Sequence, residues 1–283
     1  MNKSVVLGFS GGIDSCTAAQ HLRDDGYRVV ALTINTTNDY SLLKNAESKA
    51  NELGIEWIRY DAVELFRHEI IDYFTSSYAN GYTPAPCTRC NTLIKWRILS
   101  EVADSLNIYN IATGHYLNIV EHGGHLYIAK AADYSKDQSY YLWGIDENIL
   151  RRTLTPMSNI LKNDIRQNFA DKRESMGICF LNGCHYTEFL ASNGIELTPG
   201  DIVDINNNKL GEHNGIARYT IGQRRGVGIP EGMRIVDIDS KSNKLIVGPN
   251  NLLYKRILYI DNCRITNPDQ LLSANDITIM IRG

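Results

Sequence analysis

The first half of the chain alternates short apolar runs with amphipathic stretches. Four continuous apolar runs predict buried strands at residues 5–9, 27–34, 55–60 and 109–113. Apolar residues at helical spacing predict the intervening helices at residues 14–25, 42–53, 63–78 and 92–106. Strands that are apolar along their whole length are typical of a parallel sheet with helices on both faces. The pattern therefore predicts an α/β fold with its ligand site at the carboxyl ends of the strands.

The pattern changes after this region. Residues 118–131 alternate polar and apolar positions around two glycines, which predicts a β-hairpin. Helices are expected through about residue 193. From residue 198 onward, short alternating runs are separated by turn residues, so we expect a small all-β region. The last apolar run, residues 277–283, is expected to form a further strand.

Composition adds limits on location and partners. The 283 residues are 43% hydrophobic and 22% charged, as in an ordinary globular protein of about two domains. No apolar run approaches the roughly 18 residues of a membrane-spanning helix, and no secretory signal precedes the first strand, so we expect a cytoplasmic protein without membrane contact. Residues 1–150 carry 12 Lys and Arg against 18 Asp and Glu, whereas the remainder carries 17 against 14. A polyanion is expected to meet the second half.

A glycine- and serine-rich turn, Ser10-Gly11-Gly12-Ile13-Asp14-Ser15, joins the first strand to the first helix. Paired glycines allow a ligand to approach the backbone, and serine hydroxyls with free N–H groups at a helix start can donate to phosphate oxygens. The alternative is a plain turn with Asp14 near the N-cap of the helix. The order of strand, glycines, acid, serine and helix favours a nucleotide loop, although one without the lysine of a Walker A motif.

The S-G-G-x-D-S segment resembles the signature of the PP-loop ATP pyrophosphatases. Members of that superfamily split ATP into AMP and pyrophosphate and use the AMP to activate an oxygen atom. The resemblance implies ATP and Mg²⁺ as cofactors, with Asp14 near the Mg²⁺-bound pyrophosphate. The nucleotide contacts that it implies are Gly8, Phe9, Ser10, Gly11, Gly12, Ile13, Asp14, Ser15, Ile34 and Gly114.

Later motifs narrow this resemblance. They lie at residues 83–91 (TPAPCTRCN), 112–116 (ATGHY), 136–142 (KDQSYYL), 177–180 (GICF) and 220–226 (TIGQRRG). Together with the loop, they are similar to those of the tRNA-specific 2-thiouridylases, which exchange the C2 oxygen of the wobble uridine of certain tRNAs for sulfur. The resemblance implies a PP-loop domain at residues 1–194, a small central β domain at 195–254 and a C-terminal β-barrel that begins at 255–283 and is short or incomplete here.

Six cysteines are too few for a disulfide-stapled scaffold of this length, so their clustering suits catalysis or metal binding. By resemblance, Cys179 carries a persulfide and Cys90 attacks it, which delivers sulfur to the base and leaves a Cys90–Cys179 disulfide. Because the thiolate is the nucleophile, we expect the dipole of a helix that opens at Asn91 to lower the pKa of Cys90. The alternative for Cys179, between Ile178 and Phe180, is a small buried hydrophobe.

Cys87 stands where the resembled family commonly has an aspartate that assists as an acid or base. The resulting C-x-x-C motif leaves three interpretations open. Cys87, Cys90 and Cys179 could hold a 4Fe–4S cluster whose remaining iron binds hydrosulfide. They could instead hold Zn²⁺ with a water, or Cys87 and Cys90 could be a redox dithiol in the persulfide mechanism.

The resemblance also implies tRNA as a partner and a sulfur donor, either a persulfide carrier protein or sulfide. The tRNA contacts that it implies are Ala85, Pro86, Cys87, His115, Lys136, Asp137, Gln138, Arg224 and Arg225. For residues 136–138 the alternative is a capped, solvated helix start. Two other functions stay open at this point: a PP-loop synthetase that adenylates a small metabolite, and a non-catalytic relative that binds tRNA or a sulfur carrier.

Overall fold

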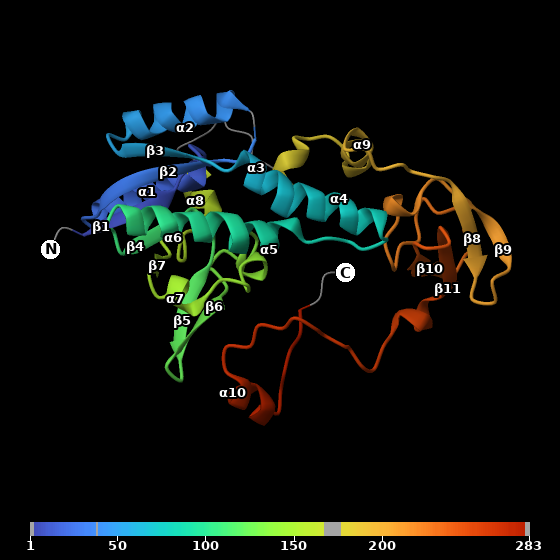
Figure 1. The fold of residues 1–283 in the computed structure, drawn as a ribbon. Helices are drawn as coiled ribbons and strands as arrows, with labels where there is room; N and C mark the ends of the chain where they lie inside the picture. The colour runs from blue at the N-terminus through green and yellow to red at the C-terminus, as the bar shows by residue number, and fades with distance from the viewer. Residues whose placement is uncertain (1–2, 38, 167–176, 281–283) are drawn as a thin grey trace. The chain divides into compact units, whose positions relative to one another are not determined.

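The computed structural model describes residues 3–37, 39–166 and 177–280 (Figure 1). The chain forms two compact units. The first comprises Met1–Ile70 and Cys87–Ser175, and the second comprises Ile71–Pro86 and Met176–Gly283. The predicted boundary between residues 194 and 195 does not coincide with the limits of these units. A compact unit need not be an independently folding domain, so the domain boundary stays a prediction.

A parallel five-stranded sheet forms the first unit. Its strands follow the order β3-β2-β1-β4-β7, which confirms the predicted α/β class. Their bounds are β1 Ser4–Gly8, β2 Arg28–Asn35, β3 Glu56–Asp61, β4 Asn110–Thr113 and β7 Thr153–Leu154. The two-residue β7 was not predicted. The predicted hairpin forms separately from this sheet, with β5 (Asn118–His122) antiparallel to β6 (His125–Ala129).

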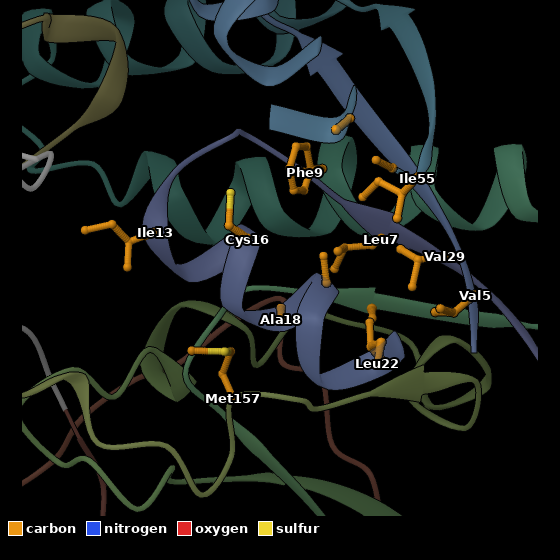
Figure 2. Packing of buried hydrophobic residues seen from close by; sticks show 14 of the residues in the cluster. Val5, Leu7, Phe9, Ile13, Cys16, Ala18, Leu22, Val29, Ile55 and Met157 are labelled. Atoms are coloured by element: carbon orange, nitrogen blue, oxygen red, sulfur yellow. The ribbon is translucent and has the colours of Figure 1, made fainter. Parts of the chain in front are cut away.

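Helices cover both faces of the sheet because its central strand is apolar on both sides. Val5 and Leu7 face the core cluster that includes Ala18 and Leu22 of the first helix (Figure 2). On the other face, a Cβ at Gly8 would lie 3.4 Å from Leu99, so the sixth helix packs there. The helices that lie in this unit, wholly or except for one terminal residue, are α1 Ile13–Asp24, α2 Tyr40–Glu52, α3 Val63–Phe66, α5 Pro86–Cys90, α6 Trp96–Ser105, α7 Glu147–Leu150 and α8 Lys162–Arg166, with π-helices at Arg67–Ile71 and Asn91–Lys95.

A four-stranded sheet with a core of its own dominates the second unit. Its strands are β8 Gly200–Asp204, β9 Lys209–His213, β10 Met233–Asp239 and β11 Lys244–Pro249, in the order β10-β11-β8-β9. The buried side chains of Ile202, Ile235 and Leu245 fill its core. This confirms the predicted small all-β region. Two helices, α4 (Asp72–Ala79) and α9 (Tyr186–Ser192), belong to the same unit.

The prediction of a strand at residues 277–283 is wrong for residues 277–280, the part of this stretch that the structure describes. Residues 277–280 form no strand and are exposed, and residues 281–283 lie outside the described part. No neighbouring strand pairs with this stretch, and an apolar run without a pairing partner forms no sheet. Residues 255–280 contain one helix, α10 (Pro268–Ser273). None of the helices in the described ranges combines the length and hydrophobicity needed to span a bilayer.

Candidate functional site

A cavity of about 280 Å³ lies at the carboxyl ends of the central strands. Strand β1 pairs with β2 on one side and β4 on the other, so the strand order reverses there. Such a point is where open parallel sheets bind ligands. The cavity is lined by Gly8, Phe9, Ser10, Asp14, Ser15, Leu32, Thr33, Ile34, Lys95, Leu99, Thr113, Gly114, His115 and Gln138.

Most of the implied nucleotide contacts therefore come together at this cavity, whereas Gly11, Gly12 and Ile13 do not line it. The glycine-rich loop is held by its own hydroxyls. Ser10 Oγ accepts from the Gly12 N–H at 3.3 Å, and Ser15 Oγ donates to the Gly12 carbonyl at 3.0 Å. Gly11 has φ +70°, and a Cβ there would lie 2.8 Å from Ala46 Cα of helix α2. The loop thus requires glycine at this position for both its conformation and its packing.

Gly114 brings the end of β4 against the start of α1. A Cβ at this position would lie 2.9 Å from the Ser15 nitrogen and 3.0 Å from the Asp14 carbonyl carbon. Both neighbours are backbone atoms of the first helical turn. The two walls of the cavity can approach this closely only because residue 114 has no side chain.

The Asp14 carboxylate accepts two hydrogen bonds. Lys162 Nζ donates to Asp14 Oδ1 at 2.5 Å, and the Tyr116 hydroxyl donates to the same oxygen at 2.9 Å. The Lys162 side chain is only 6% exposed, whereas that of Asp14 is 37% exposed toward the cavity. A buried ammonium is tolerated because a carboxylate compensates its charge.

His115 forms part of the cavity wall as a neutral imidazole. Its Nδ1 lies 3.0 Å from Thr113 Oγ1, and its ring lies 5.0 Å from that of Trp96. Burial, reinforced by the positive charge of Lys95, holds the pKa of His115 well below its ordinary value of 6.5. The structure places this residue beside Gly114, at the cavity, where the resemblance implied a tRNA contact.

The segment at residues 136–138 is fixed by hydrogen bonds. Gln138 lines the cavity and pairs with the backbone of Tyr116, through its side-chain oxygen at 3.0 Å and its own N–H at 2.8 Å. The Asp137 carboxylate accepts from the Ala131 N–H at 2.9 Å and from the Ser139 hydroxyl at 2.6 Å. Both side chains thus support the fold locally, and their contact with tRNA stays a prediction together with that of Lys136.

The helix that carries the C-x-x-C motif begins earlier than predicted. It opens at Pro86 as α5, continues as the π-helix Asn91–Lys95 and then becomes α6. Proline suits the first helical position because its fixed φ and missing N–H cost nothing there. Cys90 itself has helical angles, φ −61° and ψ −44°. The expectation that it precedes the helix is therefore wrong, and the residue that lies in the first turn is Cys87.

Polar contacts fix the cysteine-bearing helix within the first unit. Arg89, between the two cysteines, donates from Nε to the Glu69 carbonyl at 2.7 Å and from Nη2 to the Glu69 carboxylate at 2.6 Å. Cys90 is buried, and Cys87 is partly exposed. π-helical turns are frequent at functional sites, and this one ends at Lys95, which lines the cavity. One π-turn therefore connects Cys90 to the cavity wall.

Cys179 is presented by a short 3₁₀ turn, Cys179–Leu181, in the second unit. Phe180 packs edge-on against the buried Phe74, with ring centroids 5.1 Å apart. The Cys179 side chain itself is exposed, so the interpretation as a buried hydrophobe is wrong. Gly177 and Gly183, with φ of +91° and +84°, flank the turn. The neighbouring hydrophobic side chains anchor the turn, while Cys179 stays exposed.

Arg224 and Arg225 are exposed in a second loop of this unit. Gln223 fixes that loop, because its side chain accepts from the Thr220 N–H at 3.1 Å and donates to the Arg225 carbonyl at 3.1 Å. The backbone of both arginines thus belongs to a hydrogen-bonded turn with their side chains exposed, which suits contact with phosphate.

Comparison with known proteins identifies the family. Two protein-family sequence models match the chain. The one described as tRNA methyl transferase HUP domain matches residues 3–183, and the one described as tRNA methyl transferase PRC-barrel domain matches residues 187–249. A tRNA-specific 2-thiouridylase, MnmA 2 of Phocaeicola vulgatus, is 38% identical over 296 residues, which cover 99% of this chain and 84% of that protein. The chain belongs to the tRNA-specific 2-thiouridylase family.

Other members give the same result. The MnmA protein of Clostridium acetobutylicum is 35% identical over 305 residues, which cover 100% of this chain and 86% of that relative. Among solved structures, a predicted subunit of tRNA methyltransferase from Methanocaldococcus jannaschii aligns with a TM-score of 0.39 and 21% identity, over 60% of this chain and 76% of that one. Neither the fold nor the function of this chain is inferred from that structure. The HUP model extends through Cys179, a residue that the structure groups with the second unit.

The donor set of the cavity fits Mg²⁺ better than a larger metal centre. Asp14 is the carboxylate in the described cavity lining, and Mg²⁺ is commonly held by one or two carboxylates together with substrate phosphates. Among the residues that the structure describes, no three His, Cys, Asp or Glu side chains are grouped to hold a metal ion. Cys87 and Cys90 belong to the first unit and Cys179 to the second. The same residues contain no disulfide.

Two lysines of this region were assigned no role from the sequence: Lys162, which pairs with Asp14, and Lys95, which lines the cavity. Lys162 lies in no recognisable motif and is 148 residues from Asp14, so only the fold brings them together. Lys95 stands between Ile94 and Trp96, which the structure buries fully. Apolar sequence neighbours are equally compatible with an ordinary solvated lysine of an amphipathic helix, so only the fold shows that Lys95 lines the cavity.

Removing either member of the Asp14–Lys162 pair should have unequal effects on stability. Asp14→Ala leaves the buried Lys162 ammonium without its carboxylate and should lower the free energy of unfolding by about 3 kcal/mol. Lys162→Met leaves a carboxylate that is partly exposed and should cost less. Urea unfolding measures both, with Asp25→Ala, an exposed acid, as the control. Equal losses, or a larger loss for Lys162→Met, would contradict the role assigned to the pair.

His115 should make the protein sensitive to acid. Because its folded-state pKa lies below that of the unfolded chain, the unfolded state binds the proton more readily, and stability falls as the pH drops below about 6.5. The slope from this residue is at most about 1.4 kcal/mol per pH unit. Unfolding experiments from neutral to mildly acidic pH should show a smaller slope for His115→Asn. His122→Asn, in the exposed hairpin turn, should retain the original slope.

Proposed function

We propose that this protein activates the C2 oxygen of a tRNA uridine with AMP from ATP and replaces that oxygen with sulfur carried on cysteine. The observation that carries the proposal is the continuous helix that bears Cys87 and Cys90 and reaches the nucleotide cavity at Lys95. A nucleotide site and a thiol pair on one rigid element suit a reaction that uses both. Membership of the 2-thiouridylase family supports tRNA as the substrate.

Two steps account for the residues. First, the C2 oxygen attacks the α-phosphorus of ATP, and pyrophosphate leaves toward the glycine-rich loop, where the backbone N–H groups at the start of α1 can donate to it. Mg²⁺ held by Asp14 and the phosphates would offset the charge of the pyrophosphate. Oxygen bound to AMP is a far better leaving group than a carbonyl oxygen, so the pyrimidine carbon becomes open to attack by sulfur.

The second step begins from a Cys179 persulfide, whose terminal sulfur a sulfur donor supplied beforehand. The Cys90 thiolate attacks Cys179 Sγ, and the electron pair of the broken persulfide bond goes to the terminal sulfur, which leaves as hydrosulfide. Hydrosulfide adds to C2, and the C2–O bond breaks with its electron pair on AMP. A Cys90–Cys179 disulfide remains, and a thiol reductant must reduce it before the next cycle. The exposure of Cys179 supports its role as the acceptor of sulfur from a donor.

The 4Fe–4S cluster at Cys87, Cys90 and Cys179 is the alternative to this sulfur step. Iron analysis after anaerobic purification distinguishes the two mechanisms. The persulfide mechanism predicts full thiolation by iron-free protein, whereas loss of activity with loss of iron would favour the cluster.

We further propose that tRNA contacts the surface near Ala85, Pro86 and Cys87, the segment at residues 136–138, and the arginines of the second unit. An enzyme of this kind would act in the cytoplasm, where its tRNA is. Charge removal at Arg224 and Arg225 should weaken tRNA binding and reduce its salt dependence, because each lost phosphate contact lowers the salt slope by about one.

The function is tested with the purified full chain, an unmodified tRNA transcript, ATP, Mg²⁺ and a persulfide donor. Mass spectrometry of the digested nucleosides should show 2-thiouridine, with AMP and pyrophosphate formed in equal amounts. The Asp14→Ala variant should form none of these. AMP formation without tRNA change would favour a metabolite synthetase, and a methylated nucleoside would favour the activity named in the family-model description. Binding of tRNA without ATP cleavage would favour a non-catalytic relative.

A further inference from the structure

Lys95 holds a fixed place in the nucleotide cavity. It is the last residue of the π-helix Asn91–Lys95 and lies between the fully buried side chains of Ile94 and Trp96. Those neighbours fix the helix, and the partly buried lysine lines the cavity. It lines the same cavity as His115, and its positive charge contributes to the lowered pKa of that imidazole.

The charges around the cavity do not balance. The carboxylate of Asp14 is already paired with Lys162, and His115 is neutral. Among the described residues, no carboxylate forms an ion pair with Lys95. The cavity therefore carries one positive charge in excess, in a partly buried position where an anion gains most from a charge-assisted hydrogen bond.

The position of this charge indicates which part of the nucleotide it meets. The glycine-rich loop offers the backbone N–H groups at the start of α1 as donors, but it lacks the lysine of a Walker A motif. Lys95 comes from a different element, the helix that carries Cys90. Lys95 therefore brings a positive charge to the cavity from the helix that bears Cys90, in addition to the donors of the loop.

We propose that Lys95 binds the α-phosphate of the nucleotide and is a catalytic residue of sulfur transfer. This inference rests on the function proposed above. When the C2–O bond breaks, its electron pair stays with the departing oxygen, and the AMP phosphate changes from a monoanionic diester to a dianionic monoester. The Lys95 ammonium neutralises the charge that develops, which is the kind of preorganised electrostatic contribution that accelerates a reaction most.

The affinities of the full chain for AMP, pyrophosphate and ATP test whether Lys95 binds the α-phosphate. Lys95→Met should bind AMP and ATP at least tenfold more weakly than the wild type, as the loss of one charge-assisted hydrogen bond requires. Its affinity for pyrophosphate should not change. Lys95→Arg should recover part of the AMP affinity. The matched control is Lys130→Met, which removes the same charge from an exposed position of the first unit and should change none of the three affinities.

Kinetics test the catalytic part. At saturating ATP and tRNA, Lys95→Met should form 2-thiouridine about 100-fold more slowly in a single turnover, and circular dichroism should show an unchanged fold. Loss of pyrophosphate affinity with intact AMP affinity, or unchanged single-turnover rates, would overturn the assignment. These results are distinguishable from failure of the proposed function, in which the wild type itself binds AMP but forms no 2-thiouridine.

Discussion

Replacing Cys179 by serine should abolish 2-thiouridine formation and leave ATP binding intact. Serine has nearly the same size but cannot carry a persulfide sulfur. Cys179 belongs to the second unit, whereas every residue of the nucleotide cavity belongs to the first, so the substitution should not disturb the nucleotide. Because the side chain is exposed, stability should change by less than about 0.5 kcal/mol. Nucleoside mass spectrometry and calorimetric titration with ATP measure the two effects.

Cys184→Ser is the matched control for this experiment. Cys184 is also exposed and lies five residues later in the same unit. It should retain nearly full thiolation. Wild-type activity of Cys179→Ser, or an equal loss in both variants, would contradict the role of Cys179 as the sulfur carrier.

Gly114→Ala should destroy nucleotide binding with the addition of one methyl group. The new Cβ would lie 2.9 Å from the Ser15 nitrogen and 3.0 Å from the Asp14 carbonyl carbon. Because both are backbone atoms, no side-chain rotation relieves the contact, and the end of β4 must move away from the start of α1. We expect the affinity for ATP to fall at least tenfold and the free energy of unfolding to fall by about 1–3 kcal/mol.

Gly211→Ala provides the comparison. Its new Cβ would come no closer than 4.0 Å to any side chain, and the residue lies in β9 of the second unit. Fluorescence titration with a nucleotide analogue should show unchanged affinity for this variant. An unchanged affinity for Gly114→Ala would show that the two walls of the cavity are not in the contact described here.

The sheet was predictable because its strands are apolar on both faces. The continuous runs around Val5–Leu7 and Val29–Leu32 are fully buried, so a single apolar run identifies each strand. The glycine-rich loop was predictable because its chemistry is local in sequence. By contrast, β7 pairs through only two residues, Thr153 and Leu154, and shows no periodic pattern. Its place at the edge is set by contact with β4 and not by its own sequence.

The parts of the site that sequence could not predict depend on distant contacts or on the exact start of a helix. Lys162 reaches Asp14 across 148 residues. Prolines at positions 84 and 86 favour a loop in sequence, yet Pro86 opens the helix, which places Cys90 within it. The exposure of Cys179 follows from its turn, because Phe180 is anchored against Phe74. The flanking hydrophobic residues alone left a buried position open as an alternative.

The central claim is that AMP takes the C2 oxygen of uridine before sulfur arrives. An RNA substrate that carries a heavy oxygen isotope at C2 of the target uridine tests it most directly. After one turnover with ATP and a persulfide donor, mass spectrometry should find the heavy oxygen in the phosphate of AMP, in an amount equal to the 2-thiouridine formed. Heavy oxygen in water or pyrophosphate, with AMP unlabelled, would contradict the account.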